Sequence, residues 1–447
     1  MIKNIRQLIN YWTETDTLRR VVKPVDPEFE LGAVVKQFQG RTPLLFEQIT
    51  GYSVPMIVGI GGDRKRIAES MGIAPTDMLP HLIRGITNPI ATRRVEKAPV
   101  QENVILEPGD LDADFPVCRY HEEDCGDYYV SGLLVVKGPD GKKRYTSIRR
   151  MKFLGGNRTN IVITSPGLQE QYRQLEAQGE SMEIAVMFGV IPAAVLASQV
   201  STHLYDTDKL DVAGALVGEG LDVVACRTVD LEVLAEAEVV FEGRVLPNVR
   251  EYEGVFAELG GYYGGEGDQP IVEISAITHR NEPIWQTILP ASCEEKLPMA
   301  LTREATLLAT VRQVVPGIQD VHITMPGAGR FHAIIQIEKH KEGDAKQALL
   351  AAFAGDKDLK HVVVVNKDVN IWDLEDVEWA IATRFQADQD LMIVPGANGS
   401  PLEPSHELRG VSAKMGLDAT YPLGKENMFR RARIPGAESI DLRNYLE

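Results

Sequence analysis

The 447-residue sequence has few cysteines, no long apolar run and a deficit of positive charge. No CxxC pair occurs, which favours a reducing compartment over a disulfide-rich secreted protein; the four cysteines are Cys118, Cys125, Cys226 and Cys293. No stretch of about 18 apolar residues is present, so we expect no membrane span. A net charge of −17 argues against a nucleic-acid partner. The first residues match neither a signal peptide nor a transit peptide, and these absences together predict a cytoplasmic protein.

Two familiar binding motifs are also incomplete. Cys118, His121 and Cys125 lack a fourth partner at a usable spacing, so we do not expect zinc there. Residues 59–64 (GIGGDR) invite comparison with a dinucleotide-binding fingerprint. Arg64 stands where close packing of the helix would need the third glycine, so we exclude a Rossmann cofactor site.

The chain shows three successive patterns, as expected for a length that exceeds one compact core. Residues 1–110 alternate amphipathic helices and strands, which predicts an N-terminal α/β domain. Residues 111–305 are rich in short strands with few long helices, which predicts a β-barrel or sandwich core, and the proline-bearing segment 97–110 marks the boundary as a linker. Residues 306–447 are α/β again, with a buried strand at 361–366 and a glycine- and proline-rich end that we expect to wrap over another surface.

Glu253 and Glu258 are the first candidates for chemistry. They lie five residues apart, separated mainly by apolar residues, and Gly260 and Gly261 follow. This spacing is wrong for one helical face, but a glycine-flanked loop can direct both carboxylates into one pocket. An apolar pocket or a like charge would raise a carboxyl pKa and produce a general acid near neutral pH. The alternative is a solvated acidic loop in an acidic protein.

Four segments in order along nearly the whole chain resemble the UbiD family of decarboxylases; they are His121–Tyr128, Cys226–Gly243, Asn370–Arg384 and Ser412–Thr420. The resemblance implies a multidomain α/β and α+β fold: an N-terminal α/β domain, a central split β-barrel that binds flavin, and a C-terminal α/β domain that mediates oligomerisation, giving a homodimer or homohexamer. It implies non-redox, reversible decarboxylation of an aromatic or heteroaromatic acid by prenylated FMN. A separate flavin prenyltransferase supplies that cofactor.

The resemblance also implies a catalytic triad of Glu253, Arg150 and Glu258, with Glu258 as the proton donor. A guanidinium at position 150 suits bidentate contact with Glu253 and with a substrate carboxylate. Without the resemblance, Arg150 would be a surface residue of a basic strand. The implied cofactor-binding residues are Tyr145, Thr146, Ser147, Ile148, Arg149, Arg150, Leu168, Gln169, Lys209 and Lys414.

The metal site of the family is not matched. Its best-known members hold the flavin phosphate through a divalent metal, usually manganese, bound by Asn, His and Glu, and the matching positions here are Tyr145, Gln169 and Lys209. None of these is a good ligand for a hard divalent cation, so manganese and potassium stay open. Lys209 is expected to neutralise the phosphate directly. A small shift of register would instead bring in the nearby aspartates Asp206, Asp208 and Asp211.

The substrate is expected to be a small-molecule carboxylic acid. Arg303 is a candidate to bind a second, distal carboxylate, and its alternative role is a structural pair with Glu304. Furan-2,5-dicarboxylate-like acids are the first expectation and hydroxybenzoates the second. Two other functions stay open: a flavin-dependent oxidoreductase of the split-barrel type, and a catalytically silent flavin-binding protein. The lack of a nicotinamide fingerprint argues against the first, and the intact triad argues against the second.

Overall fold

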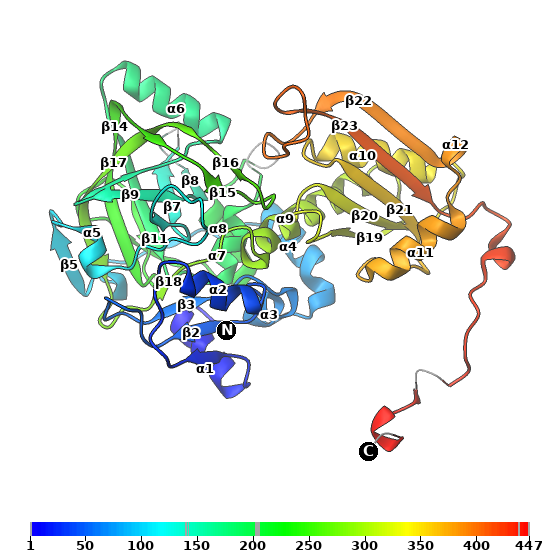
Figure 1. The fold of residues 1–447 in the computed structure, drawn as a ribbon, viewed down its shortest axis with the longest axis horizontal. Coiled ribbons are helices and arrows are strands. Elements are labelled where there is room, and N and C mark those ends of the chain that lie inside the picture. The colour runs from blue at the N-terminus through cyan, green and yellow to red at the C-terminus, as the bar shows by residue number, and fades with distance from the viewer. Residues whose placement is uncertain (1, 139–140, 142, 202–205, 437–438, 446–447) are drawn as a thin grey trace.

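The structure, a computed structural model, describes residues 2–138, 141, 143–201, 206–436 and 439–445. They form a large lobe and a smaller C-terminal lobe, and the 20-residue helix α9 (Cys293–Arg312) runs between the two (Figure 1). Within these residues, no helix combines the length and the apolar character that a membrane crossing requires.

The N-terminal part of the large lobe is an α/β layer, as predicted. Its sheet has the order β1-β2-β3-β18, with strands β1 (Arg19–Val21), β2 (Leu44–Phe46), β3 (Met56–Val58) and β18 (Trp285–Gln286). The helices are α1 (Ile5–Glu14), α2 (Glu30–Gln37), α3 (Arg64–Ser70) and α4 (Met78–Thr87). Helix α1 buries Ile5, Leu8, Ile9 and Trp12, an apolar stripe at helical spacing. Strand β18 comes from far along the chain, so this layer is joined to the next one.

A curled nine-stranded sheet forms the core of the large lobe. Eight strands follow the order β6-β9-β10-β17-β14-β11-β7-β8, and β5 adds to β17. Their bounds are β5 (Asn103–Leu106), β6 (Tyr128–Tyr129), β7 (Leu133–Lys137), β8 (Arg144–Ile148), β9 (Met151–Gly155), β10 (Arg158–Asn160), β11 (Met182–Phe188), β14 (Val239–Glu253) and β17 (Gly267–His279). The long antiparallel pair β14–β17 is its spine. A small sheet joins β4 (Arg93–Arg94), β12 (Asp222–Ala225) and β13 (Glu232–Leu234).

One sequence prediction for this part is wrong. The segment 97–110 is not a free linker, because β5 pairs with β17 along four residues. Strand pairing therefore crosses the boundary expected at residue 110. The central part has few long helices, as expected, and its helices are α5 (Leu111–Asp114), α6 (Pro166–Ala177), α7 (Pro192–Ser198) and α8 (Lys209–Val217). Every residue of α7 is buried, so its sequence has no polar face from which a helical period can be read.

The C-terminal lobe is a five-stranded sheet of order β19-β20-β21-β23-β22. Its strands are β19 (Ile318–Ile323), β20 (His332–Ile337), β21 (His361–Asn366), β22 (Leu391–Asn398) and β23 (Val411–Ala419). Its helices are α10 (Asp344–Gly355), α11 (Leu374–Arg384) and α12 (Ala387–Asp390). The predicted buried strand at 361–366 is confirmed and lies at the centre of the sheet. Residues 395–398 do not wrap elsewhere, because they belong to β22, which pairs with β23.

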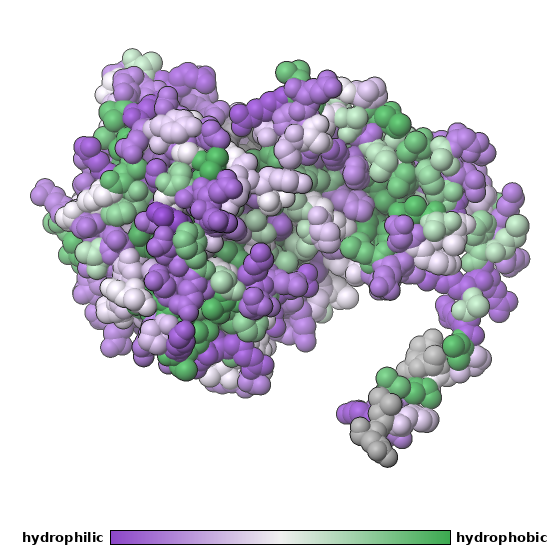
Figure 2. All heavy atoms as spheres, in the orientation of Figure 1, coloured by the Kyte–Doolittle hydropathy of each residue, from purple (hydrophilic) through white to green (hydrophobic). Residues whose placement is uncertain are grey.

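The end of the chain leaves the body of the molecule as an extended tail (Figure 1). Arg431 anchors its base: the guanidinium lies 2.6 Å from Asp376 and stacks 4.0 Å above the ring of Trp379. Large apolar side chains along the tail are exposed, namely Met428, Ile434, Ile440, Leu442 and Tyr445. Figure 2 shows some of them as green spheres on the tail. The tail thus covers little of its own chain.

Candidate active site

Arg150 joins the two carboxylates that the sequence singled out. Its Nε donates to Glu253 Oε1 at 3.0 Å, and its Nη1 forms a short hydrogen bond to Glu258 Oε1. The guanidinium also lies 4.5 Å above the ring of Phe256. Tyr128 donates to Glu253 from the other side at 3.2 Å. The structure therefore brings together all three residues of the predicted triad. The alternative interpretation, a solvated acidic loop, is wrong.

The local fold explains how residues five apart reach one arginine. Glu253 is the last residue of β14, and Glu258 follows the two-residue strand β15 (Phe256–Ala257), which pairs with β16 (Tyr263–Gly264) in a small hairpin. The carboxylate of Asp124 accepts the N–H of Ala257 at 3.0 Å and ties this hairpin to the segment before β6. The chain turns between the two glutamates, so both side chains face Arg150.

Gly265 leaves the space that the triad occupies. It has a positive φ of 84°, and a Cβ there would meet Arg150 Nη2 well inside van der Waals contact and lie 2.8 Å from Glu258 Oε1. Any other residue would strain the backbone and displace the ion pair at the same time. The hairpin therefore needs glycine at this position for two independent reasons.

The two carboxylates have different surroundings. The Glu253 side chain is fully buried, whereas that of Glu258 is 21% exposed. Burial raises the pKa of Glu253, against the opposing effect of Arg150 and of the hydrogen bond from Tyr128. Burial alone would lower the pKa of Arg150, but the two carboxylates outweigh it and the pKa is raised. Arg150 thus stays a cation, Glu253 is a fixed internal partner, and Glu258 is the carboxylate that faces the solvent side.

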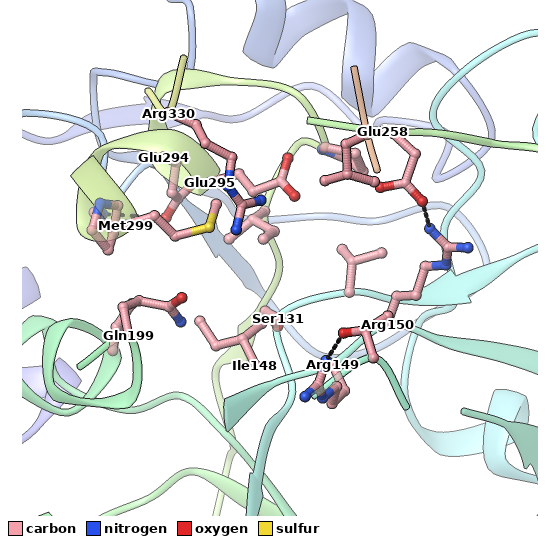
Figure 3. A pocket seen from close by; sticks show the side chains of 18 of the residues that line it. Ser131, Ile148, Arg149, Arg150, Gln199, Glu258, Glu294, Glu295, Met299 and Arg330 are labelled. Atoms are coloured by element: carbon pink, nitrogen blue, oxygen red, sulfur yellow. Dashed lines mark hydrogen bonds and ion pairs between the residues drawn. The ribbon is translucent and has the colours of Figure 1, made fainter. Parts of the chain in front are cut away.

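Glu258 and Arg150 line a cavity of about 380 Å³ at the junction of the two lobes. This volume lies in the range of small-molecule sites. In Figure 3, Glu258 and Arg150 stand on one side, Ile148 and Arg149 below them, and Glu295, Met299 and Arg330 across the space. The lining comes from the N-terminal layer, the curled sheet, and the C-terminal lobe together with the start of α9. Three parts of the chain therefore share one site.

Two acidic residues in this wall were not singled out from the sequence. Glu294 and Glu295 occupy the first turn of α9, where acidic residues ordinarily interact with the helix dipole. Because that role explains their position, the sequence gives no sign that they line a cavity. Burial raises the pKa of Glu294 to about 8, against three backbone hydrogen bonds. Burial also raises the pKa of Glu295 to about 7, with a smaller contribution from Glu258. Glu295 points into the cavity (Figure 3).

The partners of Glu294 explain the glycine-rich turn that resembled a nucleotide fingerprint. The carboxylate of Glu294 accepts the backbone N–H groups of Gly59, Ile60 and Gly61 at 2.6, 2.8 and 3.3 Å. The turn thus binds a buried carboxyl group of the same chain. It joins the N-terminal layer to the start of α9.

Basic residues lie on the side of the cavity that belongs to the C-terminal lobe. Arg330 and Lys357 line it together with Asp358, and Arg330 Nε lies 3.0 Å from Asp358. Arg303 lies behind them, with its guanidinium 2.9 Å from Asp358, and it is not among the lining residues. The alternative pair of Arg303 with Glu304 does not form. Glu304 instead binds Arg64 at 2.7 Å.

The residues expected to hold a flavin divide into three groups. Ile148, Arg149 and Arg150 line the cavity. Thr146 and Ser147 are buried with hydroxyls that find no partner among the described residues. The others lie outside the lining: Tyr145 donates to Ser165, Leu168 packs in the core, Gln169 donates to the Ile163 carbonyl, Lys209 donates to the Ser198 carbonyl, and Lys414 donates to the carbonyls of Lys357 and Leu359.

A manganese ion does not fit the residues that match its usual site. Tyr145 and Gln169 are engaged as hydrogen-bond donors, and Lys209 brings a positive charge of its own. The aspartates considered as substitutes are also occupied: Asp206 binds Lys143, while Asp208 and Asp211 bind Arg144. Among the residues with described positions, no group of three His, Cys, Asp or Glu side chains could hold a metal ion.

Comparison with known proteins identifies the class. Three family models match in succession: the N-terminal domain of 3-octaprenyl-4-hydroxybenzoate carboxy-lyase over residues 9–86, its Rift-related domain over 92–293, and its C-terminal domain over 296–419. The fold and the matched domains define a carboxy-lyase of three-domain architecture. The chain belongs to the UbiD family of decarboxylases, as its four sequence segments predicted.

Named relatives act on chemically different acids. Anhydromevalonate phosphate decarboxylase from Methanothermobacter thermautotrophicus is 33% identical over 407 residues, which cover 91% of this chain and 95% of the relative. Gallate decarboxylase from Lactiplantibacillus plantarum is 29% identical over 456 residues, which cover 92% of each chain. The family therefore fixes the type of reaction, and the substrate must be argued from the cavity.

Solved structures share the whole fold. The UbiD-class enzyme HmfF from Pelotomaculum thermopropionicum in complex with FMN has a TM-score of 0.96 and 44% identity, covering 99% of this chain and all of that one. An evolved dimeric form of HmfF in complex with prenylated FMN has a TM-score of 0.92 and 42% identity, with the same coverage. Both neighbours were solved with a flavin bound.

Proposed function

We propose that the chain decarboxylates an aromatic or heteroaromatic carboxylic acid, reversibly and without net redox change, with prenylated FMN as cofactor. The observation that carries the proposal is the bridge from Arg150 to both Glu253 and Glu258 in the wall of a cavity. A family of decarboxylases with flavin-bound structural neighbours supports the same reading. The curled sheet would serve as the split-barrel flavin domain.

The residues of the triad have separable roles. Loss of CO2 leaves an electron pair on carbon, and the bound prenylated FMN supplies the sink for that pair. Glu258 delivers the proton to this carbon, and in the carboxylation direction it removes it. Arg150 stabilises the Glu258 carboxylate once the proton has left, since the two groups share a short hydrogen bond. Glu253, buried and bonded to Tyr128, keeps the guanidinium oriented.

The cavity is suited to a cofactor and an acid side by side. Ile148, Arg149 and Arg150 would contact the flavin, together with the unpaired hydroxyls of Thr146 and Ser147. Leu168, Gln169 and Lys209 would contribute from the surrounding elements. Lys414 would act indirectly, because its ammonium fixes the carbonyl of Lys357 in the cavity wall.

The substrate we propose carries a second anionic group. Arg330 and Lys357 would bind it at the side of the cavity that faces the C-terminal lobe, with Arg303 supporting them through Asp358. Glu295 stands nearer the triad and favours a ring that offers a hydrogen-bond donor or acceptor to a carboxyl group. A furan-2,5-dicarboxylate-like acid fits this arrangement first and a hydroxybenzoate second.

The tail suggests an assembled enzyme. Its exposed apolar side chains and its anchored base are typical of a segment that packs on another subunit, and a structural neighbour has a dimeric form. We propose a homo-oligomer, a dimer or a hexamer, in which the C-terminal lobe and the tail form the contacts.

Co-expression with a flavin prenyltransferase tests the function. The protein would be purified without oxygen, its released flavin weighed by mass spectrometry, and candidate acids screened for CO2 release. Prenylated FMN with CO2 release from a dicarboxylic ring acid is the expected result. Plain FMN without CO2 release would favour a split-barrel oxidoreductase, and no flavin would favour a catalytically silent protein.

A further inference from the structure

Two cations beside the cavity, the buried Lys209 and the half-buried Arg149, have no anionic partner among the described residues. The Lys209 side chain is 5% exposed, and its Nζ donates to the Ser198 carbonyl at 2.6 Å. Arg149 donates to the hydroxyls of Thr164 and Ser165 at 2.8 and 2.9 Å, and its Nε is buried without a partner. No described carboxylate forms an ion pair with either residue, although acidic residues outnumber basic ones in the chain as a whole.

The two cations belong to one cluster. The ammonium of Lys209 lies 5.4 Å from the ring centroid of Tyr145, and the hydroxyls of Tyr145 and Ser165 are joined at 2.6 Å. Arg149 binds the same Ser165 hydroxyl. On the other side, the Ser198 carbonyl that holds Lys209 directly precedes Gln199, a residue of the cavity wall. The cluster therefore borders the cavity at the end away from Glu295 and Arg330.

Buried unpaired charge is expensive, and proteins ordinarily pair it or bind a counterion. The pKa of Lys209 reflects this cost: burial and the neighbouring Arg149 both lower it, to about 7. Burial likewise lowers the pKa of Arg149. The hydroxyl of Ser147 is also without a partner among the described residues, and Ser147 lies two residues from Tyr145 on β8 and so on the same face of the strand. Two cations and a free O–H donor together match a phosphate dianion.

We propose that Lys209 and Arg149 bind the phosphate of a flavin mononucleotide directly, without a divalent metal. The proposal rests on the proposed function for the identity of the ligand and goes beyond it in naming what replaces the metal. Lys209 supplies the charge that the ion carries in the best-known relatives. Arg149, held in place by Thr164 and Ser165, supplies oriented N–H donors. The aspartates nearby are engaged by Arg144 and Lys143 and are not metal ligands.

Flavin binding by the protein expressed without the prenyltransferase tests this. The dissociation constants of FMN and of riboflavin, which lacks the phosphate, would be measured in EDTA and again with added manganese, with elemental analysis of the FMN-loaded protein. We expect FMN to bind in EDTA without stoichiometric metal. Lys209→Met should weaken FMN by roughly 10- to 100-fold, the usual loss for one charge-assisted contact, and leave riboflavin unchanged.

Two further variants guard the interpretation. Lys209→Arg keeps the charge and should recover part of the FMN affinity. Lys339→Met removes a lysine whose side chain is also 5% exposed but which pairs with Glu342 in the C-terminal lobe, and it should bind FMN like the parent protein. If Lys209→Met does not fold, the parent protein alone decides: a metal-free preference for FMN over riboflavin is required.

Several results would overturn the proposal: release of FMN by EDTA, one equivalent of manganese per FMN, parental FMN affinity in Lys209→Met, or no FMN binding by the parent. The proposed function fails separately. Metal-free, Lys209-dependent FMN binding without CO2 release from any acid would refute the decarboxylase and keep this inference. Manganese-dependent decarboxylation would support the decarboxylase and refute metal-free binding of the phosphate.

Discussion

Gly265→Ala should disable the triad while leaving the fold intact. The new Cβ would lie 2.8 Å from Glu258 Oε1 and closer still to Arg150 Nη2, so the ion pair must move. A side chain at a φ of 84° also strains the backbone, by about 1–2 kcal/mol. Misplacement of a catalytic group by about an ångström typically costs on the order of 100-fold in rate. We therefore expect kcat/KM for CO2 release to fall by about that factor.

Gly261→Ala is the matched control in the same hairpin. Its φ is 81°, almost the same as that of Gly265, but a Cβ there meets nothing within 4 Å. In a denaturant titration both variants should lose free energy of unfolding through the same backbone strain, and Gly265→Ala should lose more because its Cβ also displaces the ion pair. Only Gly265→Ala should lose activity when both are loaded with cofactor. Equal activity in the two variants would show that the contact with Arg150 and Glu258 has no catalytic weight.

Other changes separate the remaining parts. Glu258→Gln removes the proton donor and should cost 10²–10⁴-fold in CO2 release without a change in thermal stability; near-parental turnover would remove Glu258 from the mechanism. Glu295 is neutral below its pKa of about 7 and charged above it, so kcat/KM for an anionic substrate should fall as the pH rises through about 7. Glu295→Gln should abolish that limb of the pH profile. Arg64→Met leaves Glu304, whose side chain is 1% exposed, with its contacts to His322 and the Ile323 N–H but without its arginine, and a loss of up to about 3 kcal/mol is expected in denaturant unfolding. Deletion of the tail after Arg433 should reduce the number of subunits in the assembly, measured by light scattering. An unchanged number of subunits would place the subunit contacts elsewhere.

Much of the fold follows from local patterns in the sequence. Strand β21 reads as an uninterrupted valine run, and helix α1 as an apolar stripe, so both are readable without tertiary information. Helix α7 and strand β5 were missed for opposite reasons. The first is buried on every side, and the second depends on pairing with β17, a partner far along the chain.

The residues of the site also divide into those that the sequence predicts and those that only the structure reveals. Glu253, Arg150 and Glu258 form the triad that the resemblance to the UbiD family implies, and the structure brings the three side chains together. Glu295 and Arg330 were not anticipated, because each belongs to an ordinary local setting and gains meaning only from the cavity that three parts of the chain enclose. Sequence patterns indicate the role of a residue within its own helix or strand, but not which distant helices or strands its side chain contacts.

Helix α9 connects the two lobes. Its 20 residues span about 30 Å, beginning with Glu294 and Glu295 in the cavity wall and ending against β19. Pro298, one turn after the glutamates, interrupts the hydrogen-bond ladder near the point where the helix leaves the cavity. A rotation of the C-terminal sheet must therefore either carry both acids with it or bend the helix at this proline. Either movement would change the wall of the cavity that Glu295 lines.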